Sequence, residues 1–211
     1  MPSSTAPAWP SPARFALALV FGLAITLTAA WIWGEWLVET ILPVSRALLG
    51  WIDDRFGILF LSVDHDLQDT VIRLRVNILE IFVMGGQVIS ESPTGWLEVT
   101  TTTGAMLQPM VIAPAIAFGL PAAILTRILA FALAVLLAFG FLLIDVPVTL
   151  HAYVWDMFID NLEPDRFSPL MIWHEFLHAG GRLGIAVLLG VASWKCVPSF
   201  INTTRGLVKR S

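Results

Sequence analysis

The chain has 211 residues, of which 57% are hydrophobic and only 13% are charged, and its mean hydropathy is +0.80. These values lie outside the usual range of soluble domains and favour an integral membrane protein. The formal net charge is −4 and the sequence has no basic run, which excludes nucleic acid as a partner. The single cysteine, Cys196, excludes an internal disulfide.

Four apolar stretches follow one another along the chain, and each is close to the ~20 residues that a helix needs to cross a bilayer. They occupy residues 15–37, 107–125, 128–147 and 169–195. The sequence therefore predicts an α-helical integral membrane protein with four transmembrane helices. Because residues 38–106 contain strand patterns, we expect a small extracytoplasmic β-rich (α+β) insert between the first and second helices.

The first stretch has features of both a membrane anchor and a secretory signal peptide. Residues 1–14 are rich in Pro, Ser and Ala, which predicts a disordered cytoplasmic tail. Arg14 and the small residues Thr28-Ala29-Ala30 are also typical of a cleaved signal. The apolar run continues to Leu37, which is long for a signal peptide, so we favour retention and keep cleavage as the alternative.

The insert is predicted to begin with an amphipathic helix over residues 38–56 and to continue as three or four antiparallel strands. Period-two alternation is the pattern of a half-buried strand, and residues 70–83 show it. The apolar positions of that stretch are Ile72, Leu74, Val76 and Ile78, and the polar positions are Arg73, Arg75 and Asn77. Gly85-Gly86 and Ser92-Pro93-Thr94-Gly95 predict turns. About 65 residues make a marginal core, so we expect this block to lean on the helices or on a partner.

The second half of the chain contains a helical hairpin and a final helix. The Thr126-Arg127 turn is so short that the second and third helices must be antiparallel. Residues 148–168 predict an extracytoplasmic interfacial helix and loop. Ser168-Pro169 predicts an N-cap followed by the first residue of the last helix. Residues 196–211 form a basic tail, which we place in the cytoplasm.

The charges predict the orientation in the membrane. All 16 acidic residues lie between Glu35 and Glu175, in the segments that follow the first and third stretches. Lys/Arg bias marks the cytoplasmic side, and basic residues stand at the other ends, at Arg14, Arg127 and Lys195. We therefore expect a multipass protein of the bacterial inner (plasma) membrane, with the N-terminus and C-terminus in the cytoplasm and the insert in the periplasm.

One short motif points to metal chemistry. His174-Glu175-Phe176-Leu177-His178 matches the pattern H-E-x-x-H. On a helix, residues four apart share a face, so both histidines could bind one Zn²⁺ while Glu175 activates a water. Over these five residues the chain resembles the zincin metalloproteases. The resemblance implies zinc as the cofactor, His174 and His178 as ligands, and Glu175 as the catalytic residue.

A zincin site also needs a third protein ligand, and no Asp, Glu or His follows His178 in the sequence. The upstream candidates are His151, Asp156, Asp160, Glu163 and Asp165, or the Asp64-His65-Asp66 cluster of the insert. Any of them would reverse the chain order of the zincins. In the interpretation that we favour, no cofactor is bound, and zinc is the alternative. His174, Glu175 and His178 are then polar anchors at the start of a helix, where an acidic residue is favoured by the helix dipole.

Arg182 lies inside the fourth apolar stretch, about 10 Å below its outer boundary at 1.5 Å per residue. A charge at that depth needs a partner, and Asp145 in the third stretch lies at a similar depth. Gly180, Gly181 and Gly184 would permit a close approach of the backbones. We predict an ion pair between Asp145 and Arg182, which serves either as a structural clamp or as a proton path or substrate counter-charge.

The order of the predicted elements also carries a resemblance. One anchor is followed by a strand block that ends at Thr101-Thr102-Thr103-Gly104, a hairpin that starts at Gln108-Pro109, and a final helix. This plan resembles that of small accessory membrane proteins associated with bacterial exosortases. The resemblance implies a non-catalytic accessory or assembly subunit in the processing or export of envelope proteins. Its partners would be the lipid bilayer and another membrane or envelope protein. The alternatives are a membrane-bound zinc metallohydrolase and, third, a transporter component.

Overall fold

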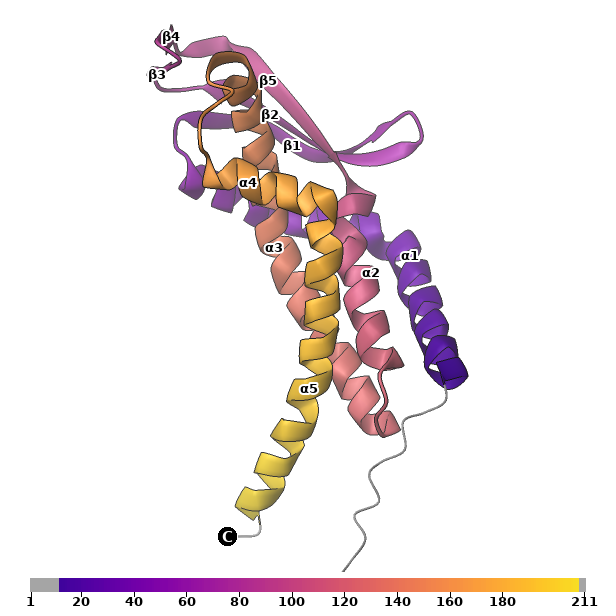
Figure 1. The fold of residues 1–211 in the computed structure, drawn as a ribbon. Helices are drawn as coiled ribbons and strands as arrows, with labels where there is room; N and C mark the ends of the chain where they lie inside the picture. Colours follow the sequence, from indigo (N-terminus) through magenta and orange to yellow (C-terminus); the bar gives the residue numbers. More distant parts are fainter. Residues whose placement is uncertain (1–11, 209–211) are drawn as a thin grey trace, which may run out of the picture. The chain divides into compact units, whose positions relative to one another are not determined.

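The computed structural model describes residues 12–208, without the side chains of residues 93 and 198–208. Most of the predicted tail 1–14 and the last three residues of the tail 196–211 therefore lie outside the described residues. Within them the chain is mostly helical, with a small antiparallel sheet between the first two helices, as predicted (Figure 1).

The described residues form four longer helices, one short helix and one π-helical turn. They are α1 (Pro12–Ile52), α2 (Thr103–Gly119), α3 (Ile124–Leu162), α4 (Pro169–Phe176), η1 (Leu177–Gly181) and α5 (Arg182–Val208). Three helical segments among the described residues are long and apolar enough to cross a membrane, namely α1, α3 and the run Pro169–Val197. The apolar helix α2 has 17 residues and is about 26 Å long at 1.5 Å per residue. The predicted fourth crossing stays a prediction.

Three helix boundaries differ from those expected. α1 continues past Leu37 to Ile52, because apolar residues at helical spacing, such as Val38, Ile41 and Leu49, remain buried there. The predicted surface helix is therefore the second part of α1. α2 starts at Thr103 instead of residue 107. It ends at Gly119 rather than at residue 125, because the ring of Pro121 and its missing N–H oppose a further turn.

The third predicted membrane helix and the interfacial helix after it are also one helix. α3 contains Pro147 and continues to Leu162, instead of ending at residue 147. Val146, directly before the proline, and Leu150, three residues after it, are fully buried, so packing stabilises the helix where the backbone hydrogen bond is missing. Only residues 163–168 remain as the predicted loop.

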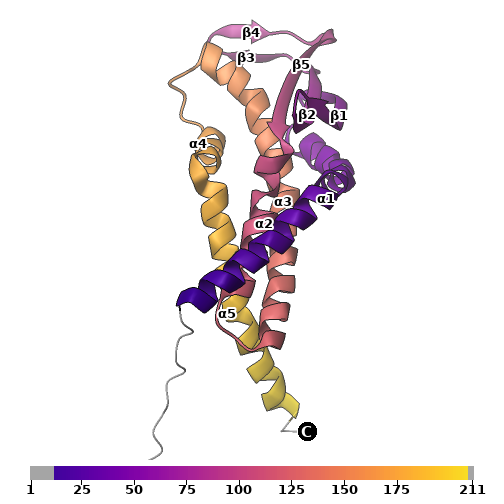
Figure 2. The same ribbon diagram turned by 90° about the vertical axis from the view of Figure 1, so that its right-hand side faces the viewer.

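The chain divides into two compact units. The first contains residues 12–29, 109–139 and 183–208 of the described chain. Its core consists of small side chains, Ala113, Ala117, Ala130, Ala134, Ala138 and Ala186 among them. A Cβ atom on Gly190 would lie 2.6 Å from the Ala113 carbonyl oxygen, so this helix contact requires glycine. Figure 2 shows α2 and the beginning of α3 as the antiparallel hairpin that the short turn predicts.

The second unit contains residues 30–108 and 140–182, and it includes the sheet. The strands are β1 (Phe56–Asp66), β2 (Asp69–Ile78), β3 (Phe82–Met84), β4 (Gln87–Ile89) and β5 (Ser92–Thr102). A three-stranded antiparallel sheet has the order β1-β2-β5, and β3 and β4 form a separate hairpin. This confirms the predicted β-rich insert.

Strand β2 shows the alternation that the sequence predicts. Leu74 pairs with Leu61 and Val99 and is 1% exposed, whereas Arg75 pairs with Phe60 and Glu98 on the opposite face. Asn77 is an exception, because it is buried although it stands in the polar register.

The two predicted turns have different outcomes. Gly85 and Gly86 have φ angles of 58° and 73°, which glycine adopts without strain, and they join β3 to β4 as expected. The segment from Ser92 to Gly95 is an irregular start of β5 instead of a free turn. Ile78 pairs with Ser92 and Val76 pairs with Leu97, so the residues between interrupt the ladder.

The insert leans on a helix, as its small size predicts. Phe56 of β1 and Phe82 of β3 pack against Trp155 and Phe158 of α3, with ring centroids 5.4–6.1 Å apart. The Gly85 N–H donates to Glu163 at 2.6 Å, just beyond the end of α3. In both views the β3–β4 hairpin lies beside this end of α3 (Figures 1 and 2).

Candidate functional site

The segment that carries the H-E-x-x-H motif starts with the predicted cap. The Ser168 hydroxyl accepts a hydrogen bond from the Met171 N–H at 3.4 Å, and Pro169 begins α4. The chain then kinks at the turn η1, which contains His178 and joins α4 to α5. Gly180 has φ +102°, and a Cβ atom on Gly181 would lie 2.4 Å from the Phe176 carbonyl oxygen. The kinked turn therefore depends on two glycines.

The structure brings the two predicted histidines together, with ring centroids 4.5 Å apart. Tyr153 of α3 joins them. Its ring centroid lies 4.6 Å from that of His174, and its hydroxyl lies within hydrogen-bond distance, 2.9 Å, of His178 Nε2. His174 is 8% exposed, and its Nδ1 atom has no hydrogen-bond partner among the described residues. We name His174, His178 and Tyr153 the His–Tyr cluster. The sequence analysis missed Tyr153, although it is the only tyrosine of the chain.

A third ligand of the zincin type is not assembled in the described part of the chain. No group of three His, Cys, Asp or Glu side chains there could hold a metal ion. His151 lies 3.9 Å from Asp53, and Glu163 accepts hydrogen bonds from Gly85 and Arg166. Among the other candidates, Asp156 is half-buried and Asp160 is exposed.

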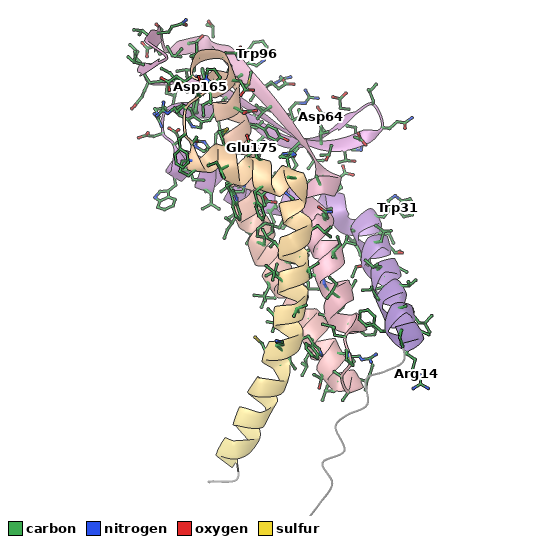
Figure 3. All side chains as sticks on the ribbon, in the orientation of Figure 1. Arg14, Trp31, Asp64, Trp96, Asp165 and Glu175 are labelled. Atoms are coloured by element: carbon green, nitrogen blue, oxygen red, sulfur yellow. The ribbon has the colours of Figure 1, made fainter. Side chains whose placement is uncertain are left out.

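Glu175 lies on the short helix α4, where its side chain is exposed (Figure 3). The structure thus places the two histidines of the motif together. A zincin mechanism, with Glu175 as the base, stays a hypothesis.

The predicted partners Asp145 and Arg182 lie in direct contact, at 3% exposure or less. Arg182 Nε donates to Asp145 Oδ2 at 2.8 Å, and its Nη2 donates to Asp145 Oδ1 at 3.2 Å. Thr149, one helical turn after Asp145, completes the arrangement. It accepts from Arg182 at 2.8 Å and donates to Asp145 at 2.9 Å. This bidentate geometry holds both charges with hydrogen bonds, as a buried ion pair requires.

A second buried carboxylate, which the sequence analysis did not single out, lies where α1 meets the sheet. Asp53 accepts hydrogen bonds from the backbone and side chain of Arg55 at 2.8–3.2 Å and from Trp155 Nε1 at 3.1 Å. Burial alone would raise the pKa of Asp53, but these hydrogen bonds and the Arg55 charge outweigh it and lower the pKa below its usual value. Asp53 therefore stays ionised and ties α3 to the start of the insert.

Charged residues of the sheet pair across the strands on its polar face. Arg73 donates to Asp64 at 2.8 Å and to Glu98, which also accepts from Arg75. These hydrogen bonds, that from Arg75 first, lower the pKa of Glu98. Asp64, the first residue of the predicted Asp64-His65-Asp66 cluster, accepts from the His65 N–H and from Arg73, so it is part of this network.

Two exposed aromatic rings complete the polar face of the sheet. The Arg75 guanidinium lies 5.7 Å from the Phe60 ring centroid and 6.0 Å from that of Trp96. Phe60, Arg73, Arg75, Trp96 and Glu98 form what we name the outer sheet face. Comparison with protein-family models, with curated proteins and with solved structures found no match to this chain.

Proposed function

We propose that this protein is a non-catalytic accessory or assembly subunit of an inner-membrane complex that processes or exports envelope proteins. In this proposal both termini are cytoplasmic and the sheet lies on the periplasmic side. Three helical segments suited to crossing a membrane support the membrane location, and the acidic residues between Glu35 and Glu175 support the orientation.

The outer sheet face is the observation that carries the proposal. Phe60 and Trp96 are 42% and 61% exposed, although the sheet has an apolar face on which such rings would be buried. Trp and Arg are enriched among the residues that dominate protein–protein binding. Because Arg73 and Arg75 are held by Glu98, the surface is already ordered before a partner binds. We infer that a partner protein docks on this face.

The exposed rings predict the effect of a substitution. Trp96→Ala should weaken the association with the partner about 30-fold, the effect of losing a ~2 kcal/mol hot spot. The measurement is photo-crosslinking in native membranes from position 100, an exposed position of β5 that pairs with Arg73 on the same face, followed by quantitative co-purification of the crosslinked protein with each variant. Trp31→Ala is the matched control, because Trp31 is 88% exposed on α1, away from the sheet strands (Figure 3). Equal co-purification with the Trp96 and Trp31 variants would contradict the proposed docking face.

The orientation has its own test, because the chain has one cysteine. In intact cells with a permeable outer membrane, a membrane-impermeant maleimide should label a Leu67→Cys, Cys196→Ser variant. Leu67 is fully exposed at the turn between β1 and β2. The wild-type protein, with only the exposed Cys196, should react after the inner membrane is opened. Labelling in the reverse order would refute the proposed orientation.

A membrane zinc hydrolase is the second candidate. It is favoured by the buried His174 Nδ1, which has no hydrogen-bond partner among the described residues and lies on a ring next to His178. Such a hydrolase would also need Glu175 as the general base that activates the attacking water. A Glu175→Gln variant that loses peptide hydrolysis while it retains zinc would identify the hydrolase. If the Glu175→Gln variant fully restores function in cells that lack the wild-type protein, the result supports the accessory subunit.

A further inference from the structure

The His–Tyr cluster contains a buried nitrogen that its surroundings do not satisfy. His174 is more than nine-tenths buried, yet its Nδ1 atom forms no hydrogen bond with the described residues. Buried polar atoms almost always have a partner, so an exception points to an ion, a ligand or a water molecule at that place.

Two further donor groups converge on His174 from different parts of the chain. The centroid of His178, from η1, is 4.5 Å from that of His174, and the centroid of Tyr153, from α3, is 4.6 Å from it. The Tyr153 hydroxyl oxygen and His178 Nε2 lie 2.9 Å apart, within hydrogen-bond distance. Neutral imidazole nitrogens and a phenol oxygen are all lone-pair donors, and imidazole is a preferred ligand of zinc, copper and nickel.

The backbone supports this arrangement independently of the side chains. His178 stands in the π-helical turn, which the positive φ of Gly180 and the close contact of Gly181 with the Phe176 carbonyl make possible. A glycine-dependent kink therefore presents the second histidine of the pair.

The positive charge nearest the cluster is that of Arg182, and it is paired. Arg182 follows η1, and its guanidinium is held by the Asp145 carboxylate at 2.8 Å and by Thr149 at 2.8 Å. The buried Asp145 carboxylate therefore offsets part of the positive charge near the cluster, and an incoming metal ion meets two imidazoles and a phenol.

We propose that His174, His178 and Tyr153 bind one divalent transition-metal ion of the imidazole-preferring class, with Zn²⁺ as its representative. Water fills the remaining coordination positions. The site differs from a zincin centre, because Tyr153 takes the place of a carboxylate ligand and Glu175 has no part in it. The metal would link α3 to the turn η1. This inference is independent of the accessory function and of the outer sheet face.

The test uses the purified full-length protein in detergent, treated with a chelator and then titrated with Zn²⁺ by calorimetry. We expect one equivalent to bind. His178→Ala and Tyr153→Phe should each weaken binding at least about tenfold, as the loss of a ligand or of a group that orients one does. Both variants should fold, because His178 is exposed and phenylalanine keeps the ring of Tyr153. Circular dichroism and gel filtration verify this.

Two matched variants test the specificity of the donor set. His65→Ala removes an exposed histidine of β1, and Glu175→Gln removes the charge of the motif's acid, so both should bind Zn²⁺ like the wild type. Wild-type protein without saturable binding would overturn the proposal. So would unchanged affinity in the His178 and Tyr153 variants, or loss of binding in Glu175→Gln. Crosslinking from position 100 reports on the accessory function separately from all of these results.

Discussion

Replacing Arg182 with alanine is expected to lower the free energy of unfolding by about 3–5 kcal/mol, because the Asp145 carboxylate is then buried without its counter-charge. Asp145 is 2% exposed and receives two hydrogen bonds from Arg182. The hydroxyl of Thr149 would remain 2.9 Å away, but one neutral donor cannot replace a guanidinium. The measurement is equilibrium unfolding in detergent, followed by circular dichroism.

Two comparisons isolate the buried charge from other effects of the substitution. The double variant Asp145→Leu, Arg182→Met removes both charges and should cost less than Arg182→Ala alone, since no charge is left unpaired. Arg46→Ala removes an exposed arginine that donates to the Ile58 carbonyl, and it should change stability by about 1 kcal/mol or less. If Arg182→Ala were as mild as Arg46→Ala, the ion pair would not stabilise the fold.

Asp53→Ala is expected to destabilise the protein by about 3 kcal/mol, because it removes a charged acceptor from several buried donors. The Trp155 indole N–H and the Arg55 guanidinium lose their partner, and the aromatic contacts of Phe56 with Trp155 lose the hydrogen bond that orients the indole. The neighbouring Asp54 is exposed, so Asp54→Ala serves as the control and should stay within about 0.5 kcal/mol of the wild type. Thermal or denaturant unfolding in detergent measures both variants.

The pH dependence of the Asp53 effect follows from the direction of its pKa shift. The folded-state pKa lies below the unfolded value of about 3.9. The unfolded state therefore binds the proton more readily, so the stabilisation by Asp53 is complete above about pH 4 and is lost as pH falls through the lowered folded-state pKa. The difference in unfolding free energy between wild type and Asp53→Asn should shrink in that acidic range. A difference that grows on acidification would contradict the assigned direction.

Local patterns in the sequence predicted several elements, because burial and hydrogen bonding there depend on near neighbours. Alternation along residues 70–78 predicted the two faces of β2, and Ser168-Pro169 predicted the cap of α4. Asp145 could be paired with Arg182 from the sequence, because a charge inside an apolar helix requires a counter-charge at the same depth.

Helix ends were harder to predict, because hydropathy does not distinguish burial in lipid from burial in protein. The apolar face of α1 continues past Leu37 and that of α3 continues past Pro147, so neither composition nor the proline marked a boundary. The two glycines after His178 gave no recognisable sign of a π-helical turn.

The missed contacts at the candidate site are long-range. Asp53 and Trp155 are 102 residues apart in the chain, and Tyr153 and His178 are 25 apart. Such pairs leave no periodic signal in a single sequence, because only the packed fold defines which of many distant residues meet. The contact of Thr149 with Asp145 was also missed, but it is local. A spacing of four residues places both side chains on one helix face, and this is visible in the sequence.

The pairing of the strands has a consequence for the order of assembly. Every hydrogen-bonded ladder of the sheet is formed within residues 56–102, so none of them requires a residue from a later helix. A chain that emerges from the ribosome with its N-terminus first can therefore form this sheet before Trp155 has been synthesised. Asp53 then already has its partner Arg55. The Trp155 indole can bind Asp53 only after α3 has been synthesised, and this hydrogen bond attaches the folded sheet to α3.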